Sequence, residues 1–242
     1  EERDEYAKRI CLRYLKSKKG DLELATEKVK ATLQFRKDYD VEGLMTAFDD
    51  ADSGLATNLQ KQLSEKKFYV MGYDKEGRST LYFIPRRTKS FDKVWHLKEA
   101  IYSMERAVAC SKSRNHTINA VVDFEGFHLT KHSPPLDIAK EFLTTLRNHY
   151  AGQIHKIFLV NCPSSFSFLW KMVSPFVGTN TKSKINFVYS YKDDSALTAL
   201  YDTDELPSFL APAGTKNREL NLEEYLFELP FDESFDEVRR QR

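Results

Sequence analysis

The N-terminal quarter of the chain has the apolar spacing of helices. Residues 4–48 are predicted to be helical, with a break at Gly20 and Asp21. Glycine is favoured where a helix ends and aspartate at an N-cap, so a basic helix is expected to stop there and a second one to begin. The face that the second helix is predicted to bury consists of Leu22, Ala25, Val29 and Leu33.

From Phe68 the pattern changes to short strands alternating with helices. Residues 68–84 predict two strands around a turn at Asp74-Lys-Glu-Gly77. Further strands are predicted at 118–124, 156–161 and 185–189, and short helices and loops from about 192. One helix should follow Asp92, with the face Val94, Leu97, Ile101, Met104 and Val108, and another Pro134-Pro135, with the face Leu136, Ala139, Leu143, Leu146 and Tyr150. This alternation predicts an α/β domain with a mainly parallel sheet.

One predicted helix, within residues 164–177, is apolar on nearly every side. Its polar stripe consists of Ser167, Lys171 and Ser174 alone. Such a helix is either buried in the core or covers an apolar cavity that another molecule occupies, and the pattern leaves both alternatives open. Pro175 either terminates this helix or helps to define a hinge.

Composition and charge exclude several classes of protein. The 242 residues suffice for one large domain, or for a small helical cap on a larger domain. A net charge of +1 argues against nucleic acid as a partner. No run approaches the roughly 20 apolar residues of a spanning helix, and Glu1–Lys19 is charged throughout, so any membrane contact should be peripheral. Three cysteines without a CxxC pair fit a reducing cytoplasm, and nothing requires more than a monomer.

Motifs of enzymes are not found in the sequence. It contains no GxxxxGK[ST], GxGxxG or GxSxG motif, so we expect no enzyme, no catalytic residues and no cofactor. His128 and His132 precede a proline pair without a nearby carboxylate, which favours solvated histidines over a metal site. Asp123 lies at the end of a predicted strand, and it is expected to hold the turn at Gly126.

Several segments, taken in order, resemble the CRAL-TRIO lipid-exchange family, which includes the yeast phosphatidylinositol/phosphatidylcholine transfer protein. Leu12–Asp21 with Phe35–Tyr39 is similar to the family's first helices, and Gly72–Arg78 to its GxDxxGR hairpin. Val122–Phe127 resembles its DLxGF strand end, and Tyr150–Lys184 follows its longest motif block without a gap. The resemblance spans roughly residues 8–210.

The resemblance implies a fold, a division of the chain and a set of site residues. The fold is α/β, with a mixed, mainly parallel sheet as the floor of an apolar lipid pocket, flanking helices, and an all-helical N-terminal lobe. The lobe is expected at residues 1–60 and the lipid-binding domain at 61–242. The helix at 164–177 falls on the family's mobile gate, which favours the cavity alternative. Residues implied to bind the headgroup are Thr181, Lys184, Lys16 and Lys18, and those implied to form the pocket and gate are Tyr82, Val122, Phe124, Tyr150, Phe166, Leu169, Trp170, Val173 and Phe176.

Two departures from the family pattern affect the ligand. A glutamate that contacts the inositol ring in relatives is replaced by Gly152, and the hydroxyl residues of choline-lipid binders are replaced by Ile118 and Ala120. We therefore expect phosphatidylinositol, held mainly by its phosphate, with a sterol or other isoprenoid as the alternative occupant. The protein would be a cytoplasmic, peripheral lipid-transfer protein, or else a lipid-dependent sensor that presents its ligand. Arg86, Arg87 and Lys89 either meet anionic headgroups or are a solvated loop.

Overall fold

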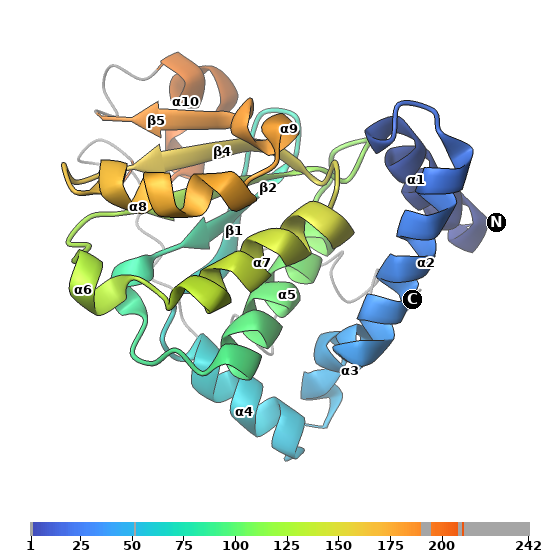
Figure 1. Ribbon diagram of the computed structural model, residues 1–242, viewed down its shortest axis with the longest axis horizontal. Coiled ribbons are helices and arrows are strands. Elements are labelled where there is room, and N and C mark those ends of the chain that lie inside the picture. Colours follow the sequence, from blue (N-terminus) through green and yellow to red (C-terminus); the bar gives the residue numbers. More distant parts are fainter. Residues whose placement is uncertain (1, 51, 190–194, 208–209, 211–242) are drawn as a thin grey trace.

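The computed structural model of the protein describes residues 2–50, 52–189, 195–207 and 210. Its N-terminal part is helical, as predicted, with the bounds α1 Glu2–Ser17, α2 Leu22–Asp38, α3 Val41–Met45, the 3-10 turn η1 Ala47–Asp49 and α4 Gly54–Leu63 (Figure 1). The Asp21 carboxylate accepts a hydrogen bond from the Leu24 amide at 2.9 Å, which confirms the predicted N-cap of α2. Gly20 has a φ of +91° in the turn that follows α1.

The predicted buried face of α2 is wrong at both of its ends. Leu22 and Leu33 are exposed, whereas Ala25 and Phe35 are buried. The helix packs on α1 and on α7, and neither neighbour covers Leu22 or Leu33.

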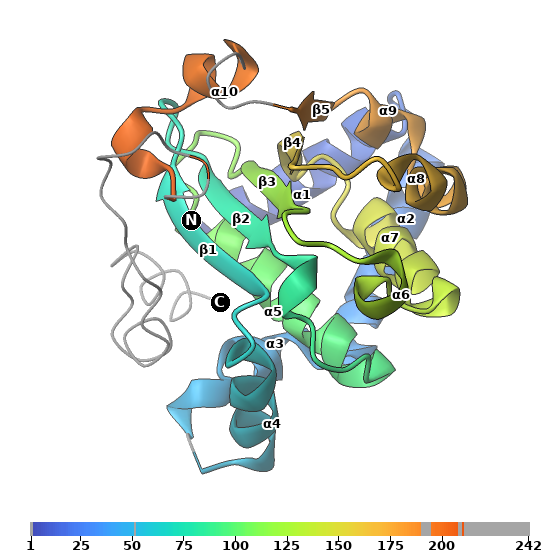
Figure 2. The same cartoon turned by 90° about the vertical axis from the view of Figure 1, so that its left-hand side faces the viewer.

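A five-stranded sheet in the order β1-β2-β3-β4-β5 forms the centre of the molecule. The strands are β1 Phe68–Tyr73, β2 Ser79–Phe83, β3 Ile118–Asp123, β4 Ile154–Val160 and β5 Ile185–Val188. The β1–β2 pair is antiparallel and the other three pairs are parallel, which confirms the predicted mixed, mainly parallel sheet. Because the parallel strands follow one another in sequence order, their right-handed crossovers all place helices on the same face, as Figure 2 shows.

The connecting helices form this single layer. They are α5 Lys93–Cys110, α6 Leu129–His132, α7 Leu136–His149, α8 Phe166–Val173 and α9 Thr179–Lys182, with the 3-10 turns η2 Pro85–Arg87 and η3 Ser174–Phe176. The predicted face of α5 is buried except for Val94, which is exposed. In α7 Leu136 is exposed, whereas Ala139, Leu143 and Leu146 are half-buried and Tyr150 is buried. The opposite face of the sheet is covered by α10 Ser195–Leu200 and the 3-10 turn η5 Thr203–Glu205.

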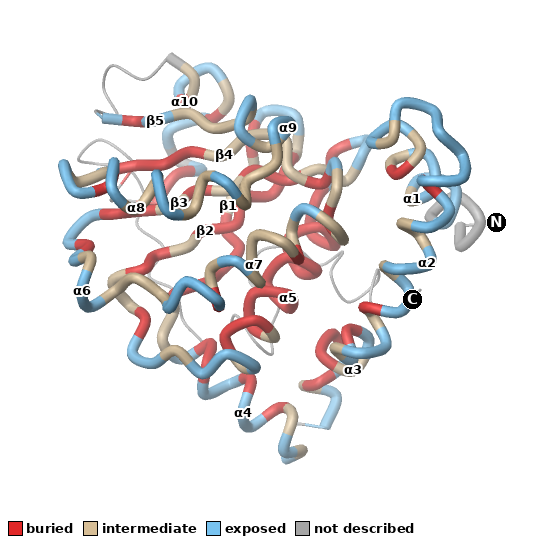
Figure 3. The backbone as a smooth tube through the Cα atoms, in the orientation of Figure 1, coloured by how far each residue is buried: buried red, intermediate tan, exposed pale blue. Residues whose placement is uncertain are grey.

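The buried side chains divide into two clusters. The larger one joins the sheet, α5 and the N-terminal helices, and α5 is buried along most of its length (Figure 3). The smaller one contains Phe124, Phe127, Leu159 and Phe166, with part of α8 packed against it. The part of the chain that the structure describes contains no helix with the length and apolar character needed to cross a bilayer.

Candidate functional site

A cavity of about 640 Å³ lies between the sheet and its layer of helices. Its floor is formed by alternate residues of the strands, since successive side chains point to opposite faces. Leu81 and Phe83 of β2 and Ile157 and Leu159 of β4 line the cavity in this way. Volumes of about 300–1,000 Å³ are typical of small-molecule sites, so the space is large enough for a guest.

The roof of the cavity consists of α7 and α8. From α7 the lining includes Ile138, Phe142, Leu143 and Leu146, and from α8 it includes Phe166, Leu169, Trp170 and Val173. Phe166 packs edge-on against Phe124 with 4.8 Å between ring centroids and stacks with Trp170 at 6.2 Å. The segment that was predicted either to be core or to cover a cavity therefore does the latter.

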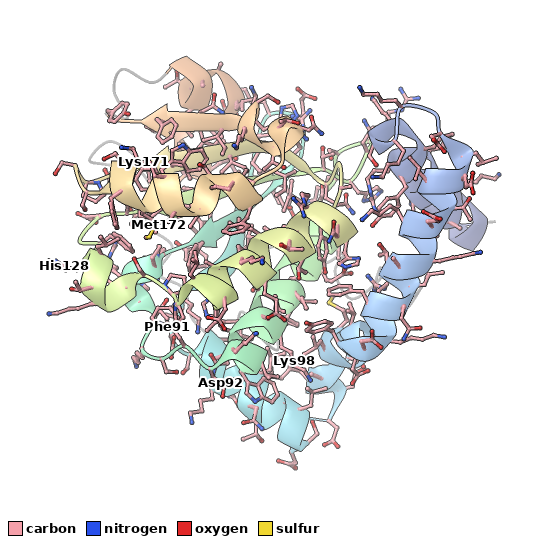
Figure 4. The ribbon with its side chains drawn as sticks, viewed as in Figure 1. Phe91, Asp92, Lys98, His128, Lys171 and Met172 are labelled. Carbon is pink, nitrogen blue, oxygen red and sulfur yellow. The ribbon has the colours of Figure 1, made fainter. Side chains whose placement is uncertain are left out.

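Helix α8 is also apolar on its outer side. Phe168 is 57% exposed and Met172 37% exposed, one helical turn apart, beside Lys171 (Figure 4). On the inner side α8 packs on the small cluster rather than on the main core. An eight-residue helix with few contacts to the main core and two exposed apolar side chains is weakly held compared with α5.

Most of the expected pocket residues line the cavity. Besides the four from α8, these are Val122, Phe124 and Tyr150. Tyr82 does not: it is fully buried on the opposite face of β2, stacked on Tyr69 at 5.1 Å, because its neighbours Leu81 and Phe83 point to the cavity. Phe176 also lies outside the lining; it is in η3, after the helix ends, where the Lys140 ammonium lies 5.6 Å from its ring centroid.

Three of the four expected headgroup residues lie at one end of the cavity. Thr181, Lys184 and Lys18 contribute to its lining, whereas Lys16 is exposed on α1 and does not. This end lies where the parallel strands begin, since Lys184 immediately precedes β5. The Lys184 ammonium donates a hydrogen bond to the Ile154 carbonyl, and burial lowers its pKa.

Two cations that the sequence did not single out lie at the same end, Lys28 of α2 and Arg147 of α7. Lys28 donates a hydrogen bond to the Asn148 side chain at 3.2 Å. Partial burial, followed by the charges of Lys18 and Arg147, lowers the pKa of Lys28. Arg147 follows Leu143 by one helical turn on the cavity side of α7, so the spacing of α7 could have predicted that Arg147 lines the cavity. No comparable pattern in the sequence indicates Lys28.

Gly152, at the same end, has a φ of +77° and leaves no room for a side chain. A Cβ placed there would lie 2.8 Å from Cγ and 3.2 Å from Cδ of Arg13, which extends from α1. Position 152, where the resemblance implies a glutamate, is therefore sterically occupied by Arg13 of α1 in this chain. The two residues that stand where choline-lipid binders are implied to carry hydroxyl groups differ in position. Ala120 lines the cavity, whereas Ile118 is fully buried outside it.

His96 of α5 lies at the opposite end of the cavity from these cations, and it was not identified from the sequence. It is 4% exposed, and its Nδ1 has no hydrogen-bond partner. Burial, and then the charge of Lys67, lowers the pKa of His96 to about 4, so the imidazole is neutral at pH 7. Phe68 and Phe83 line the same end of the cavity.

The remaining polar candidates have structural roles. The Asp123 carboxylate accepts hydrogen bonds from the Glu125 amide at 3.0 Å and the Asn161 side chain at 2.9 Å, as expected for the turn. The Asp123 carboxylate also forms an ion pair with Arg86. Arg86 is therefore not a solvated loop cation. His132 Nδ1 accepts from the His128 amide at 2.9 Å, and the described residues contain no cluster suited to a metal ion.

Comparison with known proteins identifies relatives that match more than half of this chain. A family model described as the CRAL/TRIO domain matches residues 63–211. The chain is 26% identical over 176 residues to a CRAL-TRIO domain-containing protein of Schizosaccharomyces pombe, which covers 73% of this chain and 16% of that protein. It is 28% identical over 199 residues to the phosphatidylinositol transfer protein PDR17 of Saccharomyces cerevisiae, covering 79% of this chain and 56% of that protein.

A solved structure shares the fold. The crystal structure of Sfh5 superposes with a TM-score of 0.68 at 15% sequence identity, over 96% of this chain and 80% of that one. The matched regions span 16% of the Schizosaccharomyces pombe protein and 56% of PDR17, so this chain corresponds to only part of either relative.

Proposed function

Because the chain belongs to the CRAL/TRIO domain family, we propose that it takes one lipid from a membrane and carries it with its tails inside the cavity beneath α8. The observation that supports this most directly is the 640 Å³ cavity, which is lined mainly by apolar side chains and partly roofed by a short helix. The name of PDR17 states phosphatidylinositol transfer for that relative. Phosphatidylinositol is our favoured ligand for this chain as well.

The free-energy cost of moving a lipid through water explains why a transfer protein needs a cavity and a movable helix. Exposing a sixteen-carbon tail to water costs roughly 12 kcal/mol at about 0.8 kcal/mol per CH₂, which makes spontaneous exit from a bilayer very slow. A cavity that opens only against the membrane removes this cost. The exposed Phe168 and Met172 give α8 an apolar surface that favours contact with the bilayer interface.

In the proposed mechanism no covalent bond is made or broken. Contact with the membrane moves α8 outward, and a lipid enters with its tails along the sheet. The phosphate is held by the Thr181 hydroxyl and by the ammonium groups of Lys184 and Lys18, which supply donors of the kind that phosphates accept. Return of α8 then covers the tails with Leu169, Trp170 and Val173. The protein would act from the cytoplasm and meet membranes only transiently.

A test compares substitutions on the two sides of α8. Trp170→Asp places a charge in the apolar cavity and should abolish lipid loading, whereas the matched Phe168→Asp, on the exposed side, should leave loading of detergent-dispersed lipid intact but slow transfer between vesicles. Loading is measured by mass spectrometry of the organic extract, and transfer with fluorescent lipid. Full loading of Trp170→Asp would contradict the proposed gate.

The alternative is a sensor that binds a sterol or other isoprenoid and presents it without moving it. Ala120 in the lining supplies no hydroxyl for a choline headgroup, which argues against phosphatidylcholine and keeps an isoprenoid as the competing ligand. The extract of the native protein decides the ligand, and the vesicle assay decides between transfer and sensing.

A further inference from the structure

Charge is segregated at the mouth of the cavity in a way that the whole chain does not suggest. The sequence has 37 basic and 36 acidic residues. Yet the described residues that line the cavity include four cations, Lys18, Lys28, Arg147 and Lys184, and no aspartate or glutamate. A solvated surface of this protein would carry both signs, so the absence of carboxylates sets this region apart.

The four cations come from separate elements and converge. Lys18 follows α1, Lys28 lies on α2, Arg147 lies near the end of α7, and Lys184 precedes β5. The charges of Lys18 and Arg147 act together on Lys28. Arg147 also lies against Gly178, at the end of the gate segment, where a Cβ would be 3.4 Å from its Cδ. The cluster therefore bridges the N-terminal helices and the gate.

No carboxylate neutralises these groups among the described residues. Lys28 donates to the Asn148 amide oxygen and Lys184 to the Ile154 carbonyl, both neutral acceptors. Like charges held together without a counter-ion repel one another, and an anion that binds among them relieves that repulsion.

We propose that this mouth binds a lipid headgroup with a second phosphate, a phosphomonoester on the inositol ring in addition to the phosphodiester. The proposal rests on the proposed lipid-binding function. A phosphodiester brings one negative charge, which leaves most of the four positive charges unbalanced. A phosphomonoester adds about −1.5 to −2 at pH 7, which matches the cluster much better.

The positions suit two phosphates rather than one. Thr181 and Lys184 lie beside the start of β5 and would take the phosphodiester, next to the tails. Lys28 and Arg147, on α2 and α7, line the same end of the cavity and would take the phosphomonoester. Gly152 and Ala151, which also line the mouth, carry no polar side chain that would compete for it.

The experiment measures which lipid the full chain extracts from vesicles. Phosphatidylcholine vesicles carry phosphatidylinositol, phosphatidylinositol 4-phosphate, or an equal mixture, with phosphatidylserine added to equalise surface charge. Protein is separated from vesicles and its extract is analysed by mass spectrometry. We expect the 4-phosphate to be enriched several-fold over phosphatidylinositol from the mixture.

Lys28→Gln and Arg147→Gln should each reduce this enrichment about five-fold, as expected for losing one partly exposed charge pair. The matched control Lys30→Gln, exposed on α2 and outside the lining, should retain it.

Each outcome has one meaning. Extraction of phosphatidylinositol without enrichment of the 4-phosphate, or enrichment that survives both substitutions, overturns this inference and leaves the proposed function standing. Extraction of no lipid at all overturns the proposed function itself. In a second arm, soluble inositol 1,4-bisphosphate is added to the mixture. If it blocks extraction at the concentration at which the lipid itself competes, the site takes free phosphates without the lipid, and the lipid assignment is overturned.

Discussion

At the scale of single residues, Gly152 has a conformation and surroundings that other residues tolerate poorly. Its φ of +77° lies in the left-handed region, and a Cβ would meet Arg13 at 2.8 Å. The left-handed conformation costs a residue with a Cβ about 1–2 kcal/mol, and displacement of Arg13 adds to this cost. We expect Gly152→Ala to lower the free energy of unfolding by about 2 kcal/mol or more, measured by urea denaturation.

Gly20 provides the matched control for that substitution. Its φ is +91°, but nothing lies within 4 Å of an added Cβ. Gly20→Ala should therefore show only the conformational part of the effect, about 1–2 kcal/mol. Equal destabilisation by the two variants would mean that Arg13 does not restrict position 152.

His96 is a second residue with a measurable consequence, because it stays neutral in the folded protein to about pH 4. Below pH 6.5 the unfolded chain binds a proton at this position that the folded chain does not. The stabilising contribution present above pH 6.5 is therefore lost as the pH falls towards 4, by up to about 3 kcal/mol. The difference in unfolding free energy between wild type and His96→Leu should fall by that amount between pH 6.5 and 4.

Comparison with the variant is needed because Glu99 acts in the opposite direction. Burial raises the pKa of Glu99 to about 7, although Lys67 pairs with it at 2.7 Å, so its contribution is lost as the pH rises from 4.5 to 7. The two trends offset each other in the wild-type curve. A difference between wild type and His96→Leu that does not change with pH would contradict the neutral, buried state of His96.

At the scale of elements, caps and periodicity placed the longer helices and the strands, but the pattern predicted no helix at α4 or α6. Asp21 and Asp92 both accept hydrogen bonds from the first turn of the helix that follows, because the unpaired amides there need acceptors. The exposed ends of the predicted faces, such as Val94 and Leu136, were not foreseen. Periodicity says which residues share a face, but it does not say how far the neighbouring element extends along it.

In the site, too, residues close together in sequence could be predicted, whereas residues brought together by packing could not. The α8 pocket residues form a continuous stretch of sequence, so their pattern was visible. Lys28 and Arg147 are 119 positions apart, and only the packing of α2 on α7 brings them together. Tyr82 was misplaced because a buried strand with apolar residues on both faces gives no sign of which face meets the cavity.

At the scale of the whole molecule, the single-sided layer of helices creates both the cavity and a way to open it. The sheet, α5 and the N-terminal helices share the large cluster, whereas α8 packs on the small one. An outward movement of α8 therefore disturbs few contacts of the main core. The rest of the fold should stay intact while the cavity is open, as transfer requires.

Cys162, just before α8, should report that movement. It packs against the small cluster, and burial raises the pKa of its thiol to about 11. Opening of α8 would expose the thiol and return its pKa towards about 8.5, which increases the reactive thiolate. In a Cys11→Ser background, which removes the exposed thiol, we expect vesicles containing phosphatidylinositol to raise the rate of Cys162 alkylation by iodoacetamide at least about tenfold. Cys110, buried in α5, is the internal reference, since a local opening leaves it unreactive. If vesicles leave the Cys162 rate unchanged, the membrane does not open α8; if both rates rise together, the domain unfolds as a whole and α8 is no separate gate.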